Sequence, residues 1–188
     1  MKKVILTLTL ALATLCAFAQ DFPAGMRMEI ASVSEGGEFD ENEFQVFTYK
    51  DADGSYGYYL SLGHTTNILS VFGADSDSFS FGHMDETCLV MGGTADEALA
   101  FLDGLLDLID KEPGSAAEFP CRLSTGAERL ADAGTATCMV VKRFLQGKRL
   151  CFLFRSGERT AETDLTKGNI KALRSGITFY RKLHPDLI

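Results

Sequence analysis

The chain has 188 residues, 18 of them basic and 26 acidic, and a formal net charge of −8 at pH 7. This length corresponds to one domain that can bury a sizeable core without disulfides or metals as staples. The negative charge argues against nucleic acid as a partner of the whole chain.

The first 19 residues have the pattern of a secretory signal peptide. Two lysines precede an apolar run over 4–16, and small residues end the pattern at Ala19. The run is too short to cross a membrane as a helix. We therefore expect residues 1–19 to be removed, leaving 20–188 as a single periplasmic or extracellular domain with no membrane span. A lipid anchor at Cys16 is the alternative, although leucine rather than a small residue precedes that cysteine.

Charge is unevenly distributed along the expected mature chain. Residues 20–120 hold 20 acidic and three basic residues, whereas residues 121–188 hold six acidic and 13 basic ones. In a compact fold the two parts lie side by side, and the acidic part cancels much of the field of the basic part.

Four cysteines follow the signal peptide: Cys88, Cys121, Cys138 and Cys151. They allow three disulfide pairings, and none has metal-finger spacing. A hairpin turn at 146–148 sets Cys138 opposite about Arg155. The same turn sets Cys151 opposite about Lys142, so the two Cα atoms lie beyond the limit of about 7 Å for a disulfide. We expect buried free thiols at all four positions.

Alternating apolar residues predict strands in the first half. Strands are predicted over 26–34, 44–50, 56–64, 67–73, 78–83 and 87–92. The segment DADGS, at 51–55, is a hairpin-turn signal between two of them. This part is predicted to be an antiparallel meander.

Two helices are predicted, each after a group of strands. The sequence TADE at 94–97 is a capping box and begins a helix that ends at EPG. Strands follow over 119–123, 136–145 and 149–155, the last two around the turn QGK, and a basic helix over about 166–183 closes the chain. The predicted class is α+β, an antiparallel meander sheet with two helices packed on one face, in the order β-rich, helix, β-hairpin, helix.

Each predicted helix has a glycine in its middle, Gly104 or Gly176. A glycine there costs about 1 kcal/mol relative to alanine, so we expect the helices to touch near these glycines, with acidic and basic outer faces side by side. The order of elements also suggests a duplicated unit, in which Cys88 and Gly104 correspond to Cys151 and Gly176; a plain α+β domain is the alternative.

The stretch SFGHMDETCLVMGG, at 80–93, contains the residue types of a metal site. His64 and His83 each continue an apolar strand face, and a simple meander places one strand between them. Their separation is then about 10 Å, too far for one small ion, so no metal or cofactor site is expected. Asp85 and Glu86 are predicted to form a turn. Only a rearranged strand order would join the histidines, with Asp85 as third ligand.

The segment 51–57 only superficially resembles a calcium loop. Tyr56 and Leu62 stand where an EF-hand needs glycine and glutamate, so a hairpin turn is favoured. The chain has no nucleophile elbow, phosphate-binding glycine loop or metal-binding helical His pair, and no catalytic residue is identified.

Apolar residues are predicted on both faces of the first sheet. Phe47, Tyr49 and Tyr59 have the opposite parity from Tyr58 and Leu60. The second face must be covered by the N-terminal segment 22–44, by a helix, or by a ligand, glycan or partner protein. We therefore expect an exported, non-enzymatic binding or accessory domain of bacterial type with an unknown protein or glycan partner. The alternative is a small secreted hydrolase, possibly metal-dependent.

Overall fold

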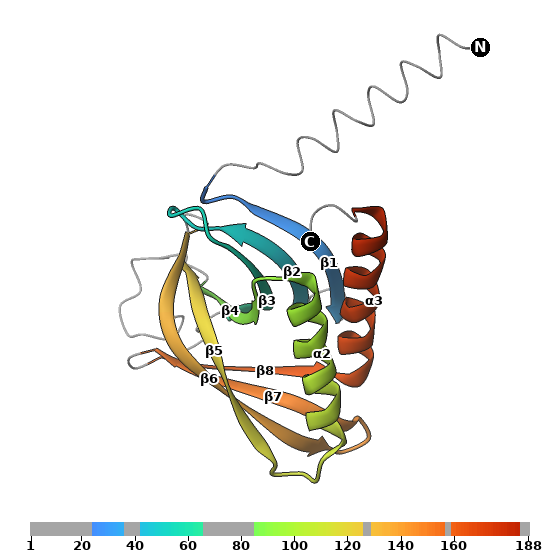
Figure 1. Ribbon diagram of the computed structural model, residues 1–188. Coiled ribbons are helices and arrows are strands. Elements are labelled where there is room, and N and C mark those ends of the chain that lie inside the picture. The colour runs from blue at the N-terminus through green and yellow to red at the C-terminus, as the bar shows by residue number, and fades with distance from the viewer. Residues whose placement is uncertain (1–23, 36–41, 66–84, 126–128, 157–158, 185–188) are drawn as a thin grey trace, which may run out of the picture.

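The computed structural model describes residues 24–35, 42–65, 85–125, 129–156 and 159–184 (Figure 1). The strands are β1 (Arg27–Glu35), β2 (Asn42–Lys50), β3 (Tyr56–Thr65), β4 (Asp85–Gly92), β5 (Ala116–Thr125), β6 (Arg129–Arg143), β7 (Gly147–Ser156) and β8 (Arg159–Thr166). The helices are α2 (Ala95–Asp110) and α3 (Lys167–Leu183). Each strand pairs antiparallel with the next one in the chain, and both helices pack on one face of this single sheet. The predicted α+β meander is confirmed.

The predicted and observed strands differ in two places. The predicted strands over 67–73 and 78–83 lie outside the described residues. The predicted meander placed these two strands between 56–64 and 87–92, and that pairing is wrong because β3 pairs directly with β4. The sequence pattern also missed β8, whose residues RTAETDLT contain a single large apolar side chain, Leu165. An edge strand pairs on one side only and needs little apolar surface.

The β6–β7 hairpin turns earlier than predicted. Cys138 pairs with Phe152, not with about Arg155, and Cys151 pairs with Met139. Because successive side chains in a strand point to opposite faces, the Cys138 and Cys151 side chains lie on opposite faces of the sheet. All four cysteines after the signal pattern are free and buried, as predicted.

Within the described ranges, the order is four strands and a helix, followed by four strands and a helix. The predicted correspondence between Cys88 and Cys151 is wrong, because Cys88 lies in the strand before α2 whereas Cys151 lies in β7 and α3 follows β8. If the unit is duplicated, β4 corresponds to β8.

Capping boxes define the start of both helices. The Thr94 hydroxyl accepts from the Glu97 N–H, and the Glu97 carboxylate accepts from the Thr94 N–H, as predicted. Thr166 and Asn169 make the same reciprocal pair before α3. Each box satisfies backbone donors that the first helical turn leaves unpaired.

Three ion pairs join the helices: Asp96–Arg181, Asp103–Arg174 at 2.6 Å, and Asp110–Lys167 at 2.7 Å. Successive pairs are seven residues apart on both helices, which is the spacing of two antiparallel helices in contact. The predicted juxtaposition of acidic and basic outer faces is confirmed. These side chains are about half exposed, so each pair contributes only about 0 to 1 kcal/mol.

The predicted helix contact at the two glycines is wrong. A Cβ at Gly104 would have no neighbour within 4 Å, so this glycine faces open space. A Cβ at Gly176 would clash with the Cβ of Ala31 in β1. Gly176 therefore allows α3 to approach the sheet, not the other helix.

The main core lies between the two helices and the sheet face that they cover. Its largest fully buried side chains are Phe44, Leu60, Leu89, Leu102, Leu105, Ile109, Leu150, Phe152, Leu165, Ile170 and Leu173. Within the described ranges, neither helix is long and apolar enough to cross a membrane.

The buried thiols predict a loss of stability at alkaline pH. Desolvation raises the pKa of Cys121 to about 11 and that of Cys138 to about 12, from 9.0. In the unfolded chain these thiols deprotonate near the lower value, so above it the unfolded state binds fewer protons than the folded state. The contribution of these thiols to the free energy of unfolding should be constant below about pH 8 and fall from about pH 9 towards 12. Urea unfolding across that range measures the fall, which should be shallower in Cys138→Ala; an unchanged slope would contradict the assignment.

Candidate functional site

A second apolar cluster lies on the sheet face opposite the helices. This outer-face cluster consists of Phe47, Tyr49, Tyr59, Cys88 and Leu130. The Phe47 and Tyr59 rings stack with centroids 5.6 Å apart, and Tyr49 meets Tyr59 edge-on at 6.2 Å. Each of the five side chains is at most 6% exposed. The predicted apolar second face is confirmed, but its side chains are already covered.

Arg27 covers one part of the outer-face cluster. Its guanidinium lies 4.0 Å from the Phe47 ring centroid and donates two hydrogen bonds, of 2.6 and 2.9 Å, to the Glu86 carboxylate. The Glu86 side chain is only 7% exposed. Glu86 and Asp85 are the first residues of β4, so the predicted turn at these positions is wrong.

Arg122 covers the other part of the cluster. Its guanidinium bonds to the Asp51 carboxylate, the Tyr59 hydroxyl and the Leu130 carbonyl, at 2.6 to 3.1 Å. It also lies about 6 Å from the ring centroids of Tyr49 and Tyr59. Each of the two arginines thus combines a carboxylate partner with an aromatic face, an arrangement that suits a planar guanidinium.

The DADGS segment is the predicted hairpin turn. Lys50 pairs with Tyr56 across it, and Asp53 accepts from the Ser55 N–H at 2.9 Å and from its hydroxyl at 2.7 Å. The hydrogen bonds from Ser55 lower the pKa of Asp53. Asp51 is held by Arg122, so protein donors occupy both carboxylates of the turn.

The outer-face cluster offers little reactive chemistry. Burial, and next the negative charge of Glu86, raise the pKa of Cys88 far above its ordinary value, so this thiol stays protonated at neutral pH. A protonated thiol is a poor nucleophile. The two oxygens of the Glu86 carboxylate each accept a hydrogen bond from the Arg27 guanidinium, so both are already occupied by protein donors. The cluster is a second core with an internal charge network.

The distance between His64 and His83, the two histidines of the metal-site hypothesis, is not given by the structure. His64 pairs with Glu86 in the β3–β4 register, and His83 lies outside the described residues. Within the described ranges, no group of three His, Cys, Asp or Glu side chains could hold a metal ion.

The turn of the β6–β7 hairpin exposes two large apolar side chains. We call residues Phe144, Leu145 and Gln146 the β6–β7 tip. Phe144 is 90% exposed and Leu145 is 91% exposed, the highest fractions among the large apolar residues of the described chain. Leu145 also has a φ of +63°, a left-handed conformation that glycine and asparagine adopt more readily than leucine.

Four basic residues flank the β6–β7 tip. Lys142 pairs with Lys148 on one face of the hairpin, and Val141 pairs with Arg149. By strand alternation, Arg143 and Arg149 lie on the other face. Both faces of the hairpin therefore carry cationic side chains beside an apolar apex.

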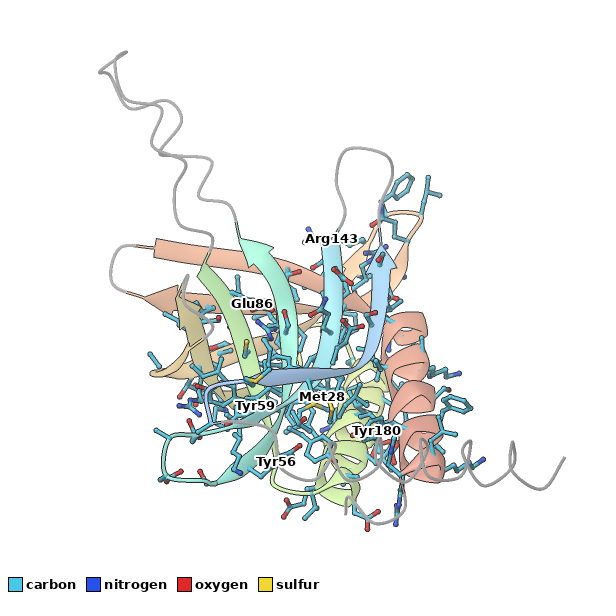
Figure 2. The ribbon with its side chains drawn as sticks, turned by 90° about the horizontal axis from the view of Figure 1, so that it is seen from above. Met28, Tyr56, Tyr59, Glu86, Arg143 and Tyr180 are labelled. Carbon is cyan, nitrogen blue, oxygen red and sulfur yellow. The ribbon has the colours of Figure 1, made fainter. Side chains whose placement is uncertain are left out.

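Two contacts hold this end of the hairpin in place. The Lys148 ammonium donates to the carbonyls of Asp110 and Lys111 at 3.1 and 2.6 Å, at the C-terminal end of α2. The Arg143 guanidinium donates to Asp164 of β8 at 3.0 Å. Figure 2 shows Arg143 well separated from Tyr59 and Tyr180, so the tip is a different surface from the outer-face cluster.

The β6–β7 tip was not predicted, because strand alternation in the sequence placed Phe144 and Leu145 at the end of a strand. The available signal was an adjacent apolar pair between Lys-Arg and Gly-Lys-Arg, where strand alternation ceases. No protein-family model, curated protein or solved structure matches the chain.

Proposed function

We propose that the chain is an exported, non-enzymatic binding or accessory domain that attaches to its partner through the β6–β7 tip. The observation that carries this proposal is the almost complete exposure of Phe144 and Leu145 at the apex of an ordered hairpin. Large apolar side chains this exposed contribute almost no buried area to the fold itself. A partner that covers them would gain that area on binding.

The conformation of Leu145 supports the same reading. A left-handed φ costs a non-glycine residue about 1 to 2 kcal/mol. The exposed apolar side chain of leucine makes no hydrogen bond with water that would offset this cost. Asparagine or glycine would suit the isolated fold better in both respects. Residues that oppose the local preferences of the chain in this way are typical of functional positions.

The hydrolase alternative has weaker support. In the described part of the chain, the buried carboxylate Glu86 is paired with Arg27, and desolvation raises the pKa of the buried thiols Cys88, Cys121 and Cys138. These groups lack the exposure and the activating neighbours that a nucleophile or a general base requires.

Fractionation of cells that produce the protein tests the proposal. The wild-type protein should sediment with the envelope, and the double variant Phe144→Ser/Leu145→Asn should move to the soluble exported fraction. Phe179→Ser is the matched control, because Phe179 is 63% exposed in α3, about 18 Å along the helix from the end beside the hairpin. The control should sediment like the wild type.

Two results would count against the proposal. Soluble wild-type protein would mean that nothing in the envelope is bound. A double variant that still sediments would point to another attachment, such as an uncleaved or lipidated segment 1–19.

A further inference from the structure

Resting on that proposed function, we infer that the β6–β7 tip inserts into an anionic lipid surface. Phe144 and Leu145 would enter the boundary between headgroups and acyl chains. The exposed Lys142 would lie at the level of the lipid phosphates, and Arg143 and Lys148, which also hold the hairpin to Asp164 and to the end of α2, would add positive charge there. The inference follows from the shape of the hairpin end and from where its charges lie.

The apex is convex and its apolar pair is outermost. Phe144 and Leu145 follow the last residue of β6, and Lys142 and Lys148 pair one step further from the apex. A turn built in this way presents apolar side chains first and cations second. That order matches the profile of a membrane interface, where long basic side chains extend towards phosphates while apolar groups enter the hydrocarbon edge.

The cations lie on both faces of the hairpin. Lys142 and Lys148 share one face, and Arg143 and Arg149 share the other. When the hairpin enters a lipid surface end-on, the lipid surrounds the tip and contacts both of its faces. A groove on a partner protein would contact mainly one face, so this distribution favours a lipid surface.

Two neighbouring acidic groups are already paired with basic ones. Asp164 accepts from Arg143, and Asp110 accepts from Lys167 at 2.7 Å. The hydrogen bond from Lys167, and less strongly the charges of Lys148 and Lys171, lower the pKa of Asp110, so this end of the helix pair carries several positive charges. The chain as a whole carries −8, so attraction to anionic lipid must be local to this end.

Co-sedimentation of the purified exported protein with lipid vesicles tests the inference. Binding is expected to mixed phosphatidylcholine–phosphatidylglycerol vesicles, with little to phosphatidylcholine alone, and should weaken as sodium chloride is added. Phe144→Ser/Leu145→Asn should lower the partition coefficient at least about tenfold, because two apolar side chains no longer enter the lipid. Phe179→Ser should bind like the wild type.

Single variants test the charge of the tip and show whether a loss of lipid binding comes from a loss of folding. Lys142→Gln should weaken binding several-fold, whereas Lys182→Gln, an exposed lysine near the far end of α3, should not. Leu145→Asn should weaken binding while raising the melting temperature, because asparagine adopts a left-handed φ more readily. A loss of binding in that variant is therefore not a loss of folding.

The outcomes distinguish the lipid inference from the proposed function. One possible result is that the wild type does not bind anionic vesicles but the double variant is still released from the cell envelope. The lipid inference is then wrong, and the tip binds a protein or glycan. Equal binding to neutral and anionic vesicles, or binding that the tip substitutions leave intact, would also overturn it. If neither assay depends on the tip, the proposed function fails as well.

Discussion

Replacing Arg27 with methionine should lower the free energy of unfolding by about 3 kcal/mol. The substitution leaves the Glu86 carboxylate, whose side chain is 7% exposed, without the two hydrogen bonds that it accepts from Arg27. It also removes the guanidinium from the face of Phe47. The 23% exposure of the Arg27 side chain lets some water reach the site, which puts the expected effect at the lower end of the range for buried pairs. Urea denaturation followed by circular dichroism measures it.

A second substitution identifies the cause of that loss. In Arg27→Met/Glu86→Leu neither partner of this pair is left as an unpaired buried charge, so most of the lost free energy should return. The control is Lys167→Met, which breaks the exposed pair with Asp110 and should cost only about 0 to 1 kcal/mol. An Arg27→Met protein as stable as the wild type would show that the pair contributes nothing and that solvent reaches Glu86.

Gly176→Ala should destabilise the protein by about 1 to 3 kcal/mol, and Gly176→Leu by more. The new Cβ would clash with the Cβ of Ala31, so α3 or β1 must move. That cost outweighs the gain of about 1 kcal/mol that alanine otherwise brings to a helix interior. Thermal unfolding compares the variants with the wild type.

Gly104 provides the matched control, since it is also a mid-helix glycine but a Cβ added to it would have no neighbour within 4 Å. Gly104→Ala should therefore stabilise the protein by about 0.5 to 1 kcal/mol. Ala31→Gly should reduce the loss of stability caused by Gly176→Ala, because it removes the Cβ of Ala31 with which the new Cβ clashes. A Gly176→Ala protein that melts above the wild type would mean that α3 does not lie against β1 at this point.

Local sequence patterns were sufficient for most of the secondary structure. Period-two alternation predicted 44–50 and 56–64, and the change to helical spacing after Thr94 predicted α2. These patterns work because a side chain's direction along a strand or helix depends only on its position in that element. The edge strand β8 was not predicted in this way, because its sequence has no alternation of apolar residues. Its backbone pairs with β7, and that pairing makes it a strand.

The hairpin register was not determined by the local pattern. The sequence around Gln146 allows a turn at either of two nearby places, and the observed one puts Gly147 at a φ of +78° and leaves Leu145 in the turn. The observed register also places Val140 and Leu150 in the main core. Burial of these residues against the helices outweighs the conformational cost at Leu145.

By itself, the sequence determined the α+β class, the alternation of strand groups with two helices, the capping box at Thr94, the apolar second face and the opposite charges of the two helices. Only the tertiary structure decided which distant residues meet: Arg27 with Glu86, Arg122 with Asp51, and Gly176 with Ala31. It also decided that the outer-face cluster is covered and that the β6–β7 tip is exposed. The physical reason is that element type follows from short-range spacing, whereas burial and pairing depend on how segments far apart in the chain pack against one another.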